Sequence, residues 1–340
     1  DGLIFKTANN CARSNTCTTN TTIHGPSGVH NKGVMQCEPG TLTLVENSCI
    51  GRSRKSKGSL TETNSPTCIT RSRVSEQAKS GSGEIRICFW NMNGLTDFKL
   101  QNDVLGSFLG NFDIILISET WSQNSEFTFK NFTYFDFSRN FKHAKSRRGA
   151  GGLGVLIRNT IVKGVDIVRR FKDIVVWLKL KRDFFGLPED IFLANVYLAP
   201  ETSTTIDDDP FIILQNELSA LPSVKYTLMC GDYNARTKTL SDYTQENVTG
   251  GNGDLDRLLP FDNNNGGIEE YLIDRGIRER YSRDKANPNN YGLQLTELCK
   301  AANLCIANGR LGYDTGVGQY TRIDTTGKSV VDYAIGTPAV

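Results

Sequence analysis

The feature that most constrains the fold is a series of short apolar segments, rich in β-branched residues, that recurs from residue 85 onward. Each is bounded by turn residues, which is typical of buried β-strands. The segments are IRICFW (85–90), DIILIS (113–118), LGVLIR (153–158), DIVVWLKL (173–180), IFLANVYL (191–198), YTLMC (226–230), LCIAN (304–308) and SVVDYAI (329–335). Residues 97–110, 209–221 and 295–304 carry a helical apolar spacing instead. Strands outnumber helices, so two packed sheets with helices outside them are predicted, in the α/β class.

Residues 1–84 have a different character from the rest of the chain. They are rich in Ser, Thr, Asn and Gly, and no apolar spacing persists along them, so a disordered tail is predicted. This tail holds ten Lys and Arg against six Asp and Glu, which gives it a net positive charge. Basic tails bind nucleic acid or serve as solvated linkers. We expect one domain over residues 85–340.

Several classes of protein are disfavoured by features that the sequence lacks. No run of 18 apolar residues is present, so no membrane span is expected. No signal peptide is visible, and the nine cysteines show no C-x-x-C pair. Cys88 and Cys230 lie inside apolar segments and are interpreted as small core residues in a reducing compartment. An intracellular protein of the nucleus or cytoplasm is predicted, not a secreted one.

Polar side chains that could bind metal or phosphate accompany five of the predicted strands. They are Asn91, Asn93, Glu119, Tyr197, Asp232, Asn234 and Asp332. Taken singly, most of them are explained equally well as turn residues. Asp332 is the exception, because a buried and unpaired carboxylate costs roughly several kcal/mol. Carboxylate and amide oxygens suit Mg²⁺, so metal-assisted phosphoester hydrolysis is the predicted reaction class.

The order of six motifs is more specific than any one of them. The motifs are WNMNGL, ISETW, RRGAGGLGVLIR, VYLAP, CGDYNA and SVVDYAI. This order resembles the endonuclease/exonuclease/phosphatase superfamily, and is most similar to the apurinic-type endonuclease domain of non-LTR retrotransposons. The resemblance covers about residues 85–340 and implies a DNase I-like sandwich of two sheets and four layers. Asn93 stands where many repair endonucleases have Asp, which is similar to the retroelement branch.

The resemblance also implies a function. It predicts a Mg²⁺-dependent endonuclease, with Mn²⁺ as a substitute, that hydrolyses a phosphodiester of DNA. The nick would supply a 3′-hydroxyl for target-primed reverse transcription by a downstream reverse transcriptase. Glu119 would be the main metal ligand, with Asn93 also on the metal. Asn91 would contact the phosphate and the metal shell, and Tyr197 would donate a hydrogen bond to the phosphate.

Three further roles follow from the resemblance. Asp232 would orient the attacking water or protonate the leaving group, and Asn234 would stabilise the transition state. Asp332 would orient a histidine that the family carries in an S-D-H motif some two dozen residues further on. The sequence ends at Val340, eight residues after Asp332, so we expect the domain to be truncated at its C-terminal end and to lack this histidine, which could leave the fragment inactive.

A basic stretch before the third predicted strand is the remaining DNA-binding candidate. It holds Lys142, Lys145, Arg147 and Arg148 within seven residues. These side chains would contact the phosphate backbone without reading sequence, or would simply form a solvated basic loop. Two alternatives to the endonuclease stay open: a catalytically incomplete relic that only binds DNA, and a phosphoesterase of the same superfamily that acts on small substrates.

Overall fold

The computed structural model describes residues 84–100, 103–122, 127–138, 151–203, 208–244, 267–325 and 327–340, and three strand segments nearer the N-terminus. The first sheet contains β1 (Ile4–Asn9), β2 (Thr43–Leu44), β3 (Asn47–Ser48), β4 (Arg86–Asn91), β5 (Ile114–Ser118), β6 (Phe132–Phe137) and β7 (Leu153–Arg158). The second sheet contains β8 (Val165–Phe171), β9 (Val175–Leu180), β10 (Ile191–Tyr197), β11 (Thr227–Asp232), β12 (Cys305–Ile306) and β15 (Asp332–Gly336). A separate hairpin joins β13 (Arg322–Asp324) to β14 (Gly327–Ser329).

The helices are short and lie outside the sheets. They are α1 (Asp97–Leu100), α2 (Asp103–Leu109), α3 (Arg182–Phe185), α4 (Pro210–Ser219), α5 (Ile268–Asp274) and α6 (Asn290–Ala301), with 3₁₀ turns η1 (Val162–Gly164) and η2 (Gly312–Asp314). The predicted start of α4 is confirmed, since the Asp209 carboxylate accepts a hydrogen bond from the Phe211 N–H and Pro210 follows it.

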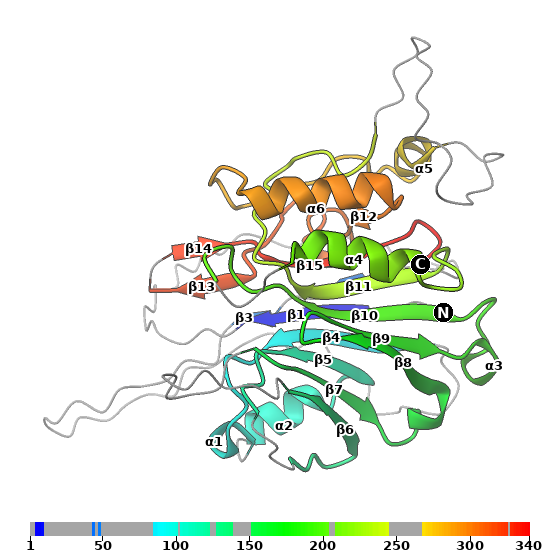
Figure 1. Ribbon diagram of the computed structural model, residues 1–340, viewed down its shortest axis with the longest axis vertical. Helices are drawn as coiled ribbons and strands as arrows, with labels where there is room; N and C mark the ends of the chain where they lie inside the picture. Colours follow the sequence, from blue (N-terminus) through cyan, green and yellow to red (C-terminus); the bar gives the residue numbers. More distant parts are fainter. Residues whose placement is uncertain are drawn as a thin grey trace, which may run out of the picture.

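Three apolar cores separate four layers (Figure 1). One core lies between the two sheets, and a second lies between the first sheet and α2. A third core lies between the second sheet and the helices α4 and α6, which cover its outer face in Figure 1. The predicted two-sheet, four-layer α/β sandwich is therefore confirmed.

Strand β5 shows why the sequence contains unbroken apolar runs. Ile114 and Leu116 face the second sheet, whereas Ile115 and Ile117 face α2. All four side chains are buried. A strand covered on both faces has no solvent-facing positions, so its residues are apolar throughout and do not alternate with polar ones.

Strand direction brings the predicted site residues to one end of the sandwich. β4 and β5 are parallel, and β10 and β11 are parallel. Asn91 ends β4, Tyr197 ends β10 and Asp232 ends β11, so their side chains leave the sheets at the carboxyl ends. β15 runs antiparallel to β11 and places Asp332 opposite Asp232.

A buried amide links the two sheets within the core. Asn195, on β10, donates hydrogen bonds from its side-chain nitrogen to the carbonyl oxygens of Ile117 and Gly154, each at 3.0 Å. These carbonyls belong to β5 and β7 of the first sheet. Because apolar packing alone has no strong directional preference, these two bonds fix how one sheet lies over the other.

The last strand begins later than the sequence indicates. Residues 329–331 were expected to belong to it, but β15 starts at Asp332. The cause is local, because side chains bind the backbone N–H groups that a neighbouring strand would otherwise use. The Asp284 carboxylate accepts from Val330, and the Thr321 hydroxyl accepts from Val331 and Asp332.

Three short strands lie in the N-terminal segment, whose description as a disordered basic tail stays a prediction. β1 lies parallel to β4, with Ile4 opposite Arg86, and β2 and β3 pair with β1. An edge strand exposes unpaired N–H and C=O groups, and β1 satisfies those of β4. The rest of residues 1–84 lies outside the described residues, and the domain boundary at residue 84 stays a prediction.

The prediction that Cys88 and Cys230 are core residues is confirmed. Cys88 and Cys230 are buried with free thiols, and burial raises the pKa of the Cys230 thiol above its usual range. Among the described residues, no helix is both long enough and apolar enough to cross a membrane.

We predict that Asn195→Leu lowers the free energy of unfolding by about 1–3 kcal/mol, because it removes a buried amide that satisfies two carbonyl groups. Urea unfolding monitored by circular dichroism measures the change. Asn216→Leu is the matched control, since Asn216 is exposed on α4. Equal effects of the two substitutions would contradict the role assigned to the buried amide.

Candidate active site

The centre of the site is the side-chain amide of Asn91. Its nitrogen donates hydrogen bonds to Glu119 Oε1 at 3.1 Å and to Asp232 Oδ2 at 2.9 Å. Asn91 ends one strand of the first sheet and Glu119 follows another, whereas Asp232 ends a strand of the second sheet. One amide therefore holds two carboxylates that come from different sheets.

Asp332 is a buried carboxylate beside this pair. Within the described part of the chain, neither of its oxygens has a hydrogen bond of good geometry, and only the Thr321 hydroxyl and the charge of Arg322 favour its ionised form. Burial raises the pKa of Asp332 well above its usual range, and the negative charges of Asp232 and Glu119 raise it further. The cost that the sequence suggested for this residue is therefore present in the structure. A carboxylate in this position requires a proton, a cation or another donor to compensate it.

Tyr197 closes another side of the site. Burial raises the pKa of its hydroxyl far above the usual range, and the charges of Glu119, Asp232 and Asp173 add to the effect. The hydroxyl therefore keeps its proton at neutral pH and is available as a hydrogen-bond donor. Asp173 lies in the turn before β9, where the backbone N–H of Tyr197 donates to the Ile174 carbonyl.

Asn234 is held from both sides of its loop. Its backbone N–H donates to Asp232 Oδ1 at 2.9 Å, and its side-chain nitrogen donates to the Leu198 carbonyl at 2.7 Å. Asn289, just before α6, donates to the Asn234 carbonyl at 2.9 Å. Asn234 is thus adjacent to Asp232 and orients one of its oxygens.

Asn93 is placed differently from the other predicted residues. Its backbone N–H donates to Asn91 Oδ1 at 3.0 Å, and its side chain is exposed. The described contacts of Asn93 therefore support Asn91 through the backbone. A direct role of the Asn93 side chain on a metal stays a prediction.

Left-handed backbone conformations gather at the site. Asn93, Glu119, Trp121 and Asn234 have φ values of 46°, 52°, 52° and 48°. Such conformations cost non-glycine residues of order 1–3 kcal/mol each and persist where the surroundings impose them. Here the N–H of Gly94 donates to the Glu119 carbonyl, and backbone hydrogen bonds on either side of it also join the two loops. These hydrogen bonds hold the Glu119 backbone in its left-handed conformation.

Asp232 is prepared for proton transfer. Burial raises its pKa to about 7, and the charge of Glu119 also raises it. Hydrogen bonds from Asn234 and Asn91 and the charge of Arg322 act in the opposite direction. A carboxyl group whose pKa lies near neutral can both accept and release a proton there.

The donor set fits a hard divalent cation. Mg²⁺ takes oxygen ligands, and is usually held by one or two carboxylates, water and substrate phosphate. The described residues hold no group of three or more His, Cys, Asp or Glu that would bind a metal unaided. Glu119 lies beside the Asn91 amide and near Asp332. It could therefore provide the carboxylate through which Mg²⁺ is usually held, with water and phosphate completing the ligand shell.

The structure brings most of the predicted residues together. Asn91, Glu119, Tyr197, Asp232, Asn234 and Asp332 lie in one cluster, whereas the side chain of Asn93 is exposed beside it. Lys142, Lys145, Arg147 and Arg148 lie outside the described residues. Sequence analysis missed Asp173, Asn289, Thr321 and Arg322, which no strand-end pattern marks.

The described site combines carboxylates, amides and a tyrosine at the strand ends of a two-sheet sandwich. The chain belongs to the endonuclease/exonuclease/phosphatase family, whose model matches residues 88–340. That match confirms the resemblance to the superfamily. Members of this family include nucleases and phosphatases, as its name states. No curated protein matches the chain.

Solved structures with a similar fold are distant in sequence. The endonuclease domain of TRAS1, a telomere-specific non-LTR retrotransposon, has 13% identity and a TM-score of 0.38 over 68% of this chain and 76% of that one. The Neisseria 3′ phosphatase NExo, bound to a product DNA hairpin, has 13% identity and a TM-score of 0.40 over 74% and 86%. The Xenopus laevis APE2 catalytic domain has 12% identity and a TM-score of 0.43 over 74% and 82%.

We predict that the metal-free chain loses stability as the pH rises from about 4 to about 7, because Asp232 has an ordinary pKa of 3.8 when unfolded and about 7 when folded. Below this pH range Asp232 is protonated in both the folded and the unfolded chain. Within the range only the unfolded chain releases the proton, so unfolding becomes more favourable as the pH rises. The slope contributed is up to about 1.4 kcal/mol per pH unit.

Urea unfolding in EDTA at several pH values measures this slope. Asp232→Asn should flatten the slope, whereas Asp274→Asn, at an exposed position on α5, should leave it as in the parent chain. A slope that Asp232→Asn does not change would contradict the prediction.

Proposed function

We propose that this chain is a divalent-cation-dependent phosphodiesterase that nicks DNA, and that it is the endonuclease of a non-LTR retroelement. The observation that carries the proposal is the Asn91 amide, which joins Glu119 to Asp232 across the two sheets. Around it lie a donor, Tyr197, and a buried acid, Asp332. The retroelement role rests on the order of the sequence motifs and implies a reverse transcriptase partner that extends the nicked end.

Each side chain has a distinct task in this proposal. Mg²⁺ bound beside Glu119 would neutralise charge that develops on the phosphate. Asp232, with one oxygen held by Asn91 and the other by the Asn234 N–H, takes a proton from the attacking water or gives one to the leaving oxygen. Tyr197 stays protonated and donates to a phosphate oxygen.

A basic patch beside the site favours DNA over a small phosphoester. It consists of Arg283, Lys285, Arg322 and Lys328, all exposed. The two loops that carry it are joined, because the Arg283 carbonyl accepts from the Tyr320 hydroxyl and the Lys328 ammonium lies over the Tyr320 ring. Figure 1 shows the β13–β14 hairpin projecting from the sandwich.

The acids near the basic patch are already paired. Asp284 is buried against Arg236 at 3.0 Å, and Asp324 contacts Arg322 at 2.7 Å. Arg322 also links the patch to the site, because its charge favours the ionised forms of Asp232 and Asp332. Exposed cations next to a phosphate-processing site suit a polyanion that extends beyond the reacting phosphate. A small substrate would need no such surface.

We predict that the chain, alone or extended through the S-D-H motif that the resemblance implies, nicks supercoiled plasmid in Mg²⁺ and not in EDTA. Glu119→Gln should lower the rate more than about a hundredfold, because it removes the negative charge that would hold the cation. Thermal unfolding should change little, because the side chain lies at the rim. Glu297→Gln, on the exposed face of α6, is the matched control.

The result separates the alternatives. A large loss of stability in Glu119→Gln would show that Glu119 is structural. DNA binding without nicking would favour the relic, and hydrolysis of phosphomonoesters without nicking would favour the small-substrate phosphoesterase.

We predict that Arg283→Ala combined with Lys285→Ala weakens DNA binding and reduces the salt dependence of binding by a slope of about 2. Hydrolysis of bis(4-nitrophenyl) phosphate should be unaffected, because that substrate does not reach the basic patch. Fluorescence anisotropy of a labelled duplex at several salt concentrations measures the slope.

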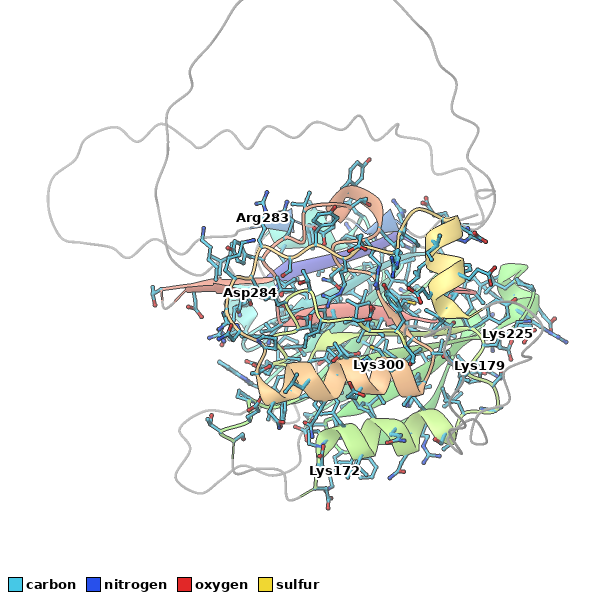
Figure 2. All side chains as sticks on the ribbon, turned by 90° about the horizontal axis from the view of Figure 1, so that it is seen from above. Lys172, Lys179, Lys225, Arg283, Asp284 and Lys300 are labelled. Carbon is cyan, nitrogen blue, oxygen red and sulfur yellow. The ribbon has the colours of Figure 1, made fainter. Side chains whose placement is uncertain are left out.

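The control for the basic patch removes the same charge elsewhere. Arg182 and Lys225 are exposed at the opposite end of the sandwich, and Figure 2 shows Lys225 far from Arg283. A double alanine variant of these two residues should keep the parent slope. Equal slopes in all three proteins would exclude the basic patch as the DNA contact.

A further inference from the structure

Lys99 makes an unusual set of contacts next to the site. From α1 it reaches back to the turn that follows β4. Its ammonium donates hydrogen bonds to the carbonyl oxygens of Met92, Asn93 and Gly94, the last two at 3.1 and 2.7 Å. These are consecutive residues, and a lysine ammonium has three N–H donors. The turn therefore presents three convergent carbonyls to a single cation.

Such a turn is unfavourable without a positive charge at its centre. Successive carbonyls point to opposite sides of an extended strand, whereas here three of them converge on Lys99, in a turn where Asn93 and Gly94 have φ values of 46° and 88°. Convergent backbone carbonyls are the ligands with which proteins replace the hydration shell of a monovalent cation. Lys99 supplies this cation from within the chain.

The same turn sets the position of the site. The Asn93 N–H orients Asn91 Oδ1, and the other end of that amide holds Glu119 and Asp232. The Gly94 N–H donates to the Glu119 carbonyl at 2.7 Å. A change in the turn would therefore move the amide and the carboxylate together.

We infer that Lys99 is a positioning residue whose ammonium is the internal cation of the Met92–Gly94 turn, and that a small free ammonium ion can take its place. A test of this role by DNA nicking rests on the proposed function, whereas a test by the shape of the turn does not. The role predicts chemical rescue of a truncated side chain, which a lysine that merely packs would not show.

The turn contains its own optical reporter. Trp121 packs directly on Gly94, since a Cβ at that glycine would lie 2.4 Å from the indole ring. Its fluorescence therefore responds to the shape of the turn whether or not the chain cuts DNA. Trp90 and Trp177 also emit, so the Trp121 signal is taken as the difference from chains that carry Trp121→Phe.

The test compares Lys99→Ala in methylammonium chloride and in tetramethylammonium chloride at equal ionic strength. We expect Lys99→Ala to shift the Trp121 emission and to nick DNA about tenfold more slowly, because charge-assisted hydrogen bonds are lost. Methylammonium should restore both readouts, and tetramethylammonium, which has no N–H donor, should restore neither. Lys99→Met fills the same space without a charge and should not be rescued.

The matched control is Lys300→Ala, which removes a lysine of α6 that pairs with Glu297. It should leave both readouts unchanged. Unaltered Trp121 emission in Lys99→Ala, or an altered emission that methylammonium does not reverse, would overturn the inference. If Lys99→Ala folds in methylammonium and not in tetramethylammonium, methylammonium has rescued it and the inference is supported. If the variant folds in neither salt, the inference is overturned. A parent chain that does not nick DNA would contradict the proposed function alone, because the Trp121 emission still tests the role of Lys99.

Discussion

Hydrogen bonds from two side-chain amides connect the sheets of this protein. Asn195 makes them in the core, where it binds two carbonyls of the first sheet, and Asn91 makes one at the rim, where it reaches Asp232 of the second. Apolar side chains supply most of the free energy that holds the sheets together, but they tolerate small displacements. Hydrogen bonds are directional and do not. The site inherits its precision from this pair of amides.

The site itself is electrostatically unfavourable in the absence of a ligand. Glu119, Asp232 and Asp332 bring like charges close together, and burial raises the pKa of the two aspartates. Non-glycine residues held in left-handed backbone conformations add strain at the same place. Perturbed acids and strained turns gather where chemistry is done. A cation and a phosphate group would relieve the charge imbalance, so the binding of substrate is coupled to local stability.

The sequence predicted those parts of the structure that depend on local patterns. Buried strands appear as apolar runs, and the acids at their ends mark the site, as Asp232 and Glu119 do. Contacts between residues distant in sequence leave no such pattern. Asn195 sits within an ordinary apolar run, and nothing local indicates that its amide crosses to β5 and β7. Lys99 likewise belongs to a helical segment, and only the fold shows that it turns back onto the site.

The late start of the last strand shows the same limit. Asp284 and Thr321 take the backbone N–H groups of residues 330–332, and neither residue is near the strand in sequence. Val330 and Val331 have a high strand propensity, but tertiary hydrogen bonds place the start of pairing at Asp332.

Because Asn91 and Asp232 come from different sheets, the geometry of the candidate site depends on the spacing between the sheets. A displacement of one sheet by less than the length of a hydrogen bond would separate Asn91 from Asp232 while leaving each sheet intact. Heating, or core substitutions that loosen the interface between the two sheets, would then disrupt the candidate site before the chain unfolds. A variant that carries such substitutions would stay folded but lose the arrangement of the candidate site, although none of the site residues had changed.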